Sequence, residues 1–131
     1  NGISGQSIAA INFSIIKKVC AFLDVKKEFI ASSEQNFDFK NVGDAGEWAL
    51  RIAEQMEATE YVNPVAGATL FDGEKFSASR IKLSFLTSQE VVYSQPGSFE
   101  PFLSIIDVLM FNGKEGTKDL LNKYSVETAK R

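Results

Sequence analysis

Ser104 and Asp107 are the only polar residues in the apolar run of residues 102–111. On a helix, side chains three positions apart share a face. An ionised carboxylate among apolar neighbours is costly unless it is hydrogen-bonded or paired, so Asp107 must reach a partner or a polar pocket. Two roles fit: Asp107 pins a loop such as residues 63–67, or it lines a substrate pocket as a general base. We take Asp107 as the candidate catalytic residue and Ser104 as a substrate-binding candidate.

Two loops supply further candidates. Ser33 lies in the polar stretch of residues 32–36, and Asn63 and Gly67 delimit an Asn-Pro-Val-Ala-Gly segment. If the stretches before these loops are parallel strands, both loops leave the same carboxyl edge of a sheet, where open α/β sheets bind ligands. The same residue types are also what turns need. Each loop is therefore either a turn or one side of a binding site.

Aromatic and basic residues give weaker signals. Tyr61 and Tyr93 are placed to stack on a sugar or a base, and both join the substrate-binding candidates. Trp48 falls on a helical core stripe, so we expect it to pack. Arg80 and Lys82 fit a phosphate site, although a solvated strand face is the simpler interpretation.

The elements that must position these residues alternate between helix and strand. Apolar residues three or four apart predict helices from residue 7 to 22 and from 48 to 56, and a short helix is expected at 74–79. Strands are predicted at 27–31, 61–62 and 81–85, with a weaker one at 91–93. The run from residue 101 predicts a core helix that ends at Asn112-Gly113, followed by a final amphipathic helix. This order predicts a small layered α/β domain with a short, mostly parallel sheet flanked by helices.

Length and composition set limits on the function. A chain of 131 residues fits one domain, with residues 125–131 expected to fray. The net charge of −3, with scattered basic residues, argues against nucleic acid as the main partner. The absence of histidine and the single cysteine exclude a Ser-His-Asp triad within this chain, a His-ligated metal and a disulfide framework. No apolar run is long enough to span a bilayer, and no cofactor fingerprint or metal motif is present.

Two blocks resemble the WbqC-like family. One is Tyr-Val-Asn-Pro-Val-Ala-Gly at residues 61–67, with its Leu-Phe-Asp follow-on at 70–72. The other is Leu-Ser-Ile-Ile-Asp-Val-Leu-Met-Phe-Asn at 103–112. The chain departs from the family pattern at Ala66, at Glu57, where a helix-ending glycine is common, and at Trp48. The similarity runs from about residue 7 to 121 and implies that the chain is the carboxy-terminal portion of a larger α/β protein.

What the resemblance implies is a cytoplasmic transferase of bacterial O-antigen and other surface-polysaccharide biosynthesis. Aminoacyl or acyl transfer to a nucleotide-linked amino sugar would fit, with a nucleotide-sugar or an acyl donor as the small-molecule substrate. The alternative is a non-catalytic binding or scaffold module of a polysaccharide-assembly complex. A partial α/β unit would also leave a sheet edge open, which is a reason to expect a homo-oligomer.

Overall fold

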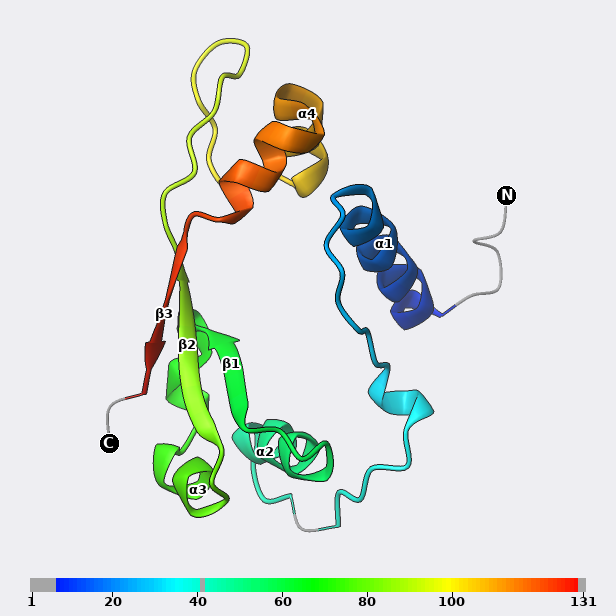
Figure 1. Cartoon of the computed structure of the whole chain (residues 1–131), viewed down its shortest axis with the longest axis vertical. Helices are drawn as coiled ribbons and strands as arrows, with labels where there is room; N and C mark the ends of the chain where they lie inside the picture. Colours follow the sequence, from blue (N-terminus) through cyan, green and yellow to red (C-terminus); the bar gives the residue numbers. More distant parts are fainter. Residues whose placement is uncertain (1–6, 41, 130–131) are drawn as a thin grey trace. The chain divides into compact units, whose positions relative to one another are not determined.

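The computed structural model describes residues 7–40 and 42–129, which group into two compact units (Figure 1). The first unit contains residues 7–35 and 91–122. The second contains residues 36–40, 42–90 and 123–129. Each unit thus combines two separate stretches of the chain. The single domain expected from length stays a prediction.

The second unit is built on a three-stranded mixed sheet in the order β1-β2-β3 (Figure 1). Strand β1 (Glu60–Pro64) pairs in parallel with β2 (Lys82–Ser88), and β2 pairs antiparallel with β3 (Tyr124–Thr128). The strands predicted at 61–62 and 81–85 are therefore confirmed, and so is the small α/β fold. The parallel pair carries a helical crossover between its strands, as parallel pairing requires.

Two helices pack on one face of this sheet. Helix α2 (Ala45–Gln55) supplies Leu50, and α3 (Gly73–Ala78) supplies Phe76; both join Leu83 of β2 in the buried core. The 3-10 segment η2 (Val65–Leu70) connects β1 to α3. Because side chains alternate along a strand, the opposite face carries the residues between the core positions. Val62 and Val126 on that face are each 44% exposed, so the described residues leave it open.

The first unit contains α1 (Ile8–Phe22), the 3-10 turn η1 (Ser32–Glu34) and α4 (Ile105–Leu121). Ser7 caps α1 by accepting a hydrogen bond from the Ala10 N–H. Lys114 of α4 lies 2.7 Å from a carboxylate oxygen of Asp24 just after α1. Leu23 and Thr117 are buried. No helix in the two described stretches combines the length and apolarity needed to cross a bilayer.

Three helices end on a non-glycine residue in the left-handed region: Asp24 (φ 56°), Glu57 (φ 53°) and Arg80 (φ 59°). After each, the next residue's N–H bonds back to a carbonyl five positions earlier, for example Ala58 to Ala53 at 2.9 Å. This is the Schellman pattern, whose left-handed position favours glycine. The sequence departure at Glu57 is therefore a glycine position filled by another residue.

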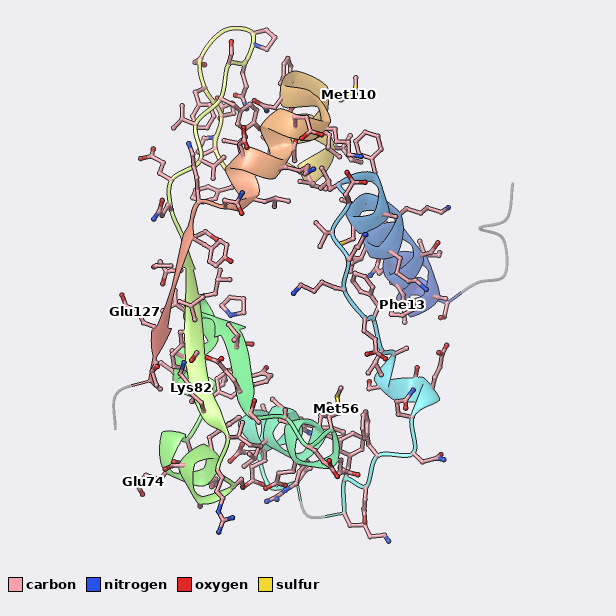
Figure 2. The ribbon with its side chains drawn as sticks, viewed as in Figure 1. Phe13, Met56, Glu74, Lys82, Met110 and Glu127 are labelled. Carbon is pink, nitrogen blue, oxygen red and sulfur yellow. The ribbon has the colours of Figure 1, made fainter. Side chains whose placement is uncertain are left out.

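Several predicted elements are wrong. No strand forms at 27–31 or 91–93, because neither stretch pairs with a neighbouring strand to complete a ladder. Helix α4 begins at Ile105 rather than residue 101, and Gly113 (φ 62°, ψ −171°) interrupts it at the predicted break. This helix is not the core helix that its composition predicts, since Ile106 is 65% and Met110 79% exposed (Figure 2).

The chain end also differs from expectation. Residues 125–128 were expected to fray, yet they belong to β3 and pair with β2. Ala129 continues the ladder by donating its N–H to the carbonyl oxygen of Leu83. Polarity alone suggested a tail, but an exposed outer strand has the same composition. Residues 130–131 lie outside the described residues.

Candidate functional site

Asp107 is tied to the loop that precedes its own helix. The hydroxyl of Tyr93 donates to Oδ2 of Asp107 across 2.6 Å, and Nε2 of Gln95 donates to the same oxygen across 3.4 Å. Gln95 also bridges to Glu100, donating to its carbonyl oxygen and accepting from its N–H. Asp107 therefore pins residues 93–100 within the first unit; that it pins residues 63–67, as the sequence suggested, stays a prediction.

The hydroxyl of Tyr93 is a hydrogen-bond donor that retains its proton. Its hydrogen bond to Asp107 raises the pKa of the phenol above the ordinary tyrosine value, with partial desolvation acting in the same direction. Its ring lies edge-on to Phe99, at 5.7 Å between centroids, and 6.5 Å from Phe111. The phenol therefore keeps its proton at neutral pH and stays available to the carboxylate.

Ser104 is the N-cap of α4. Its Oγ accepts a hydrogen bond from the N–H of Ile106, and its carbonyl oxygen accepts from Asp107 and Val108. Asp107 consequently stands in the first helical turn, where the helix dipole favours a negative charge. The spacing of Ser104 and Asp107 resembles a capping box, yet the carboxylate bonds Tyr93 and Gln95 instead of closing the box.

Asn63 and Gly67 form a second group, in the second unit. The hydroxyl of Tyr61 donates to Oδ1 of Asn63 across 3.1 Å, and Nδ2 of Asn63 donates to the carbonyl oxygen of Pro64. A Cβ on Gly67 would stand 2.5 Å from that Nδ2, so a side chain there would displace the amide. Burial raises the pKa of Tyr61, whose ring stacks on Phe76 at 5.6 Å. The loop is thus a turn in which hydrogen bonds fix the side-chain amide of Asn63.

Ser33 does not follow a strand, although the sequence predicted one before it. It lies exposed in η1 of the first unit, and no strand precedes it. Because no strand forms at residues 27–31, the shared sheet edge predicted for this loop and residues 63–67 does not exist. Within the first unit, Tyr93, Gln95, Ser104 and Asp107 form one polar group; within the second, Tyr61, Asn63 and Gly67 form another.

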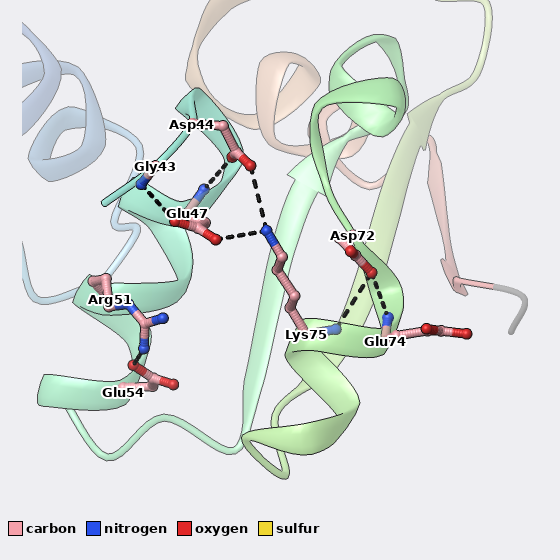
Figure 3. Close-up of polar contacts among 8 residues, drawn as sticks. All are labelled: Gly43, Asp44, Glu47, Arg51, Glu54, Asp72, Glu74 and Lys75. Atoms are coloured by element: carbon pink, nitrogen blue, oxygen red, sulfur yellow. Dashed lines mark hydrogen bonds and ion pairs between the residues drawn. The ribbon is translucent and has the colours of Figure 1, made fainter. Parts of the chain in front are cut away.

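Lys75 organises a polar network that the sequence did not reveal (Figure 3). Its Nζ lies 2.5 Å from Oε1 of Glu47 and 3.4 Å from Oδ2 of Asp44, which joins α3 to the start of α2. The bond from Lys75 and the N–H of Gly43 lower the pKa of the Glu47 carboxyl. For Asp44, the bond from the Glu47 N–H is the main cause of a lowered pKa, and Lys75 adds to it. These bonds hold the two helices together.

A shallow groove of about 610 Å³ runs between α3 and the strands β2 and β3. Its wall includes Ser77, Arg80 and Lys82, together with the carboxylates of Asp72 and Glu74. Lys82 pairs with Glu60 at 3.0 Å, which fits the solvated strand face favoured by the sequence. The groove itself escaped prediction because it forms only where residues 128–129 lie beside the stretch 72–83, which is distant from them in the chain. Among the described residues, no group of three or more His, Cys, Asp or Glu side chains is placed to hold a metal ion.

Comparison with known protein families gives a match. The WbqC-like protein family matches it over residues 3–119, most of its length. The chain belongs to the WbqC-like protein family. No curated protein and no solved structure matches it. Both polar groups of this WbqC-like chain lie inside the matched range, whereas β3 lies beyond it. That the chain corresponds to the carboxy-terminal portion of the family stays a prediction.

Proposed function

We propose that this WbqC-like chain is a transferase component of bacterial surface-polysaccharide biosynthesis in the cytoplasm, transferring an aminoacyl or acyl group to a nucleotide-linked amino sugar. Family membership supports the pathway. The observation that carries the chemistry is the state of Asp107. Two donors fix its Oδ2, and no hydrogen bond to Oδ1 occurs among the described residues. A positioned carboxylate with an available acceptor oxygen is suited to general-base catalysis.

In this reaction the amine nitrogen of the sugar attacks the carbonyl carbon of the acyl donor. As the C–N bond forms, Asp107 accepts the N–H proton, and the bond from the carbonyl carbon to the donor's leaving group breaks with its electron pair. Tyr93 keeps its own proton because its bond to Asp107 raises its pKa. It thus holds the carboxylate without competing for the substrate's proton.

The binding roles fall on side chains that keep spare hydrogen-bonding capacity. Ser104 uses its Oγ as an acceptor at the cap, so its O–H is able to donate to a substrate. Asn63 gives one N–H to Pro64 and keeps a second. Within the first unit, we assign Ser104 and the exposed Ser33 to polar substrate groups. Within the second unit, we assign Asn63 to such a group, with Tyr61 and Gly67 as further substrate-binding residues.

Thermal shifts test substrate binding. The chain is titrated with nucleotide-sugars, acyl donors and free nucleotides in parallel, because a ligand that binds only the folded state stabilises it in a concentration-dependent way. The proposal expects a rising transition temperature for one substrate class and a reduced rise for Ser104→Ala. Flat titrations for all three classes would contradict substrate binding by this chain.

A second candidate function is a non-catalytic binding or scaffold module. The observation that favours it is that each assigned polar group also serves local structure: Ser104 caps a helix, Asp107 pins a loop and Asn63 orders a turn. The two functions differ in one variant. Asp107→Asn keeps an acceptor for Tyr93 but removes the base, so a scaffold retains product formation in a reconstituted pathway and a transferase loses it.

A further inference from the structure

The outer strand β3 is an open sheet edge. Among the described residues, the sheet order places it at one side, paired with β2 alone, and all its residues are exposed. Neither a proline nor a strand bulge protects it, although natural edges are commonly blunted in this way. Glu127, one of its residues, extends from the outer side of the sheet in Figure 2.

The hydrogen bonds on either side of β3 show which backbone groups are unpaired. Ala129 donates to the carbonyl oxygen of Leu83, and the carbonyl oxygen of Lys123 accepts from Gln89, both at 2.9 Å. In an antiparallel pair, alternate residues direct their N–H and C=O toward the partner. Residues 123, 125, 127 and 129 therefore face β2, and Tyr124, Val126 and Thr128 direct their backbone groups away from the sheet.

We propose that a second copy of this chain pairs with that edge, β3 against β3, antiparallel about a two-fold axis at Val126. In this register Val126 faces the second copy's Val126, and Tyr124 faces the second copy's Thr128. Every outward-facing N–H and C=O of the strand then finds a partner, because directly opposed residues exchange both bonds. The result is one continuous sheet running through both copies, with an isologous contact.

Charge favours the antiparallel pairing of this edge with a second copy. Lys123, which directly precedes β3, and Glu127 within it are four residues apart and lie on the same face. With the axis at Val126, Lys123 sits diagonal to the second copy's Glu127, within reach of long side chains. The two-fold axis repeats the pair, so two opposite-charge contacts flank the joined strands. Moving the axis to Ser125 or Glu127 shortens the paired stretch of β3 from five residues to three, so the length of the strand selects the Val126 axis.

The open face of the sheet adds apolar contact. Val126 is 44% exposed and Tyr124 47% exposed. Pairing brings two copies of each onto one surface, where Val126 meets its own counterpart across the axis. An interface of two five-residue strands is small, so the dimer is weak, with a dissociation constant on the order of micromolar.

Sedimentation velocity over a concentration series tests the pairing, with circular dichroism as the check on folding. The wild-type mass is expected to rise from 14.4 kDa toward twice that value as concentration increases. Val126→Pro removes an outward N–H and leaves the bonds to β2 intact, so it should stay monomeric. A wild type that stays monomeric throughout, or a folded Val126→Pro variant that dimerises as the wild type does, would overturn the proposal.

A charge exchange tests the antiparallel pairing without proline. Lys123→Glu and Glu127→Lys each place like charges across the axis, and each is expected to weaken the dimer. Combining both substitutions in one chain restores opposite charges across the axis, so the double variant should recover wild-type association. Single variants that dimerise like the wild type, or a double variant no stronger than either single one, would overturn the Val126-centred pairing.

Discussion

Gly46 lies so close to Leu70 that a Cβ on Gly46 would stand 1.9 Å from the Leu70 carbonyl oxygen. Gly46 is buried in the first turn of α2, and Leu70 is the last residue of η2. Because Gly46 has no side chain, the start of α2 packs directly against the backbone of the segment that follows β1. The loop carrying Asn63 and Gly67 is therefore held by backbone packing as well as by its own hydrogen bonds.

Gly46→Ala is expected to destabilise the chain by about 1–3 kcal/mol, because the added methyl group meets a backbone oxygen that cannot rotate away. Chemical denaturation with urea measures the change. Gly73→Ala is the matched control, since nothing lies within 4 Å of a Cβ at that position. Equal stabilities for the two variants would show that α2 does not pack on Leu70 as described.

Glu57→Gly should stabilise the chain. Glu57 ends α2 in the left-handed region, where a Cβ crowds the following carbonyl and glycine does not. We expect a gain of about 0.5–1 kcal/mol, equivalent to roughly 2–5 °C in the unfolding midpoint. Glu57→Ala removes the same charge and keeps the Cβ, so it separates the backbone effect from the electrostatic one. A midpoint for Glu57→Gly no higher than that of Glu57→Ala would contradict this account.

The Lys75 network predicts a pH dependence of stability. Lys75 and its neighbours lower the pKa of Glu47 and Asp44 in the folded state. A carboxyl whose folded pKa is depressed contributes stability above its unfolded pKa and loses it as the pH falls through the folded value. The free energy of unfolding should therefore decrease below about pH 4.5.

Lys75→Met should make that acid-side decrease shallower, because it removes the main cause of the lowered Glu47 pKa. Urea titrations at a series of pH values give the slope. Lys40→Met is the control, since the Lys40 side chain is 85% exposed and lies 3.8 Å from Asp38. Identical slopes for wild type and Lys75→Met would show that Lys75 does not cause the loss of stability at acid pH.

Local patterns predicted most of the second unit. Periodic apolar residues predicted α2, and the alternation around Leu83 predicted β2. In both elements the buried positions follow the periodicity of the local sequence. The outer strand β3 was mistaken for a tail because exposed edges lack alternation. The stretch 27–31 has the composition of a strand, but a strand needs a partner that local sequence does not specify.

The candidate site was predicted in part. The polar spacing of Ser104 and Asp107 located both residues, and Tyr93 was selected for its aromatic ring. The hydrogen bond between Tyr93 and Asp107 joins residues 14 positions apart in the chain. At that separation the residue types do not predict which side chains meet. The groove between α3 and β3 and the Lys75 network depend on tertiary contacts in the same way, so neither followed from the sequence.

The rate of product formation by Asp107→Asn tests most directly whether Asp107 acts as a base in a transfer reaction. Wild type and variant are incubated with nucleotide-linked amino sugars and acyl donors, and the acylated product is followed by mass spectrometry beside the unfolding midpoint. We predict a loss of about 100-fold or more in rate, with the midpoint nearly unchanged because asparagine still accepts from Tyr93. A variant that forms product at the wild-type rate would contradict the account.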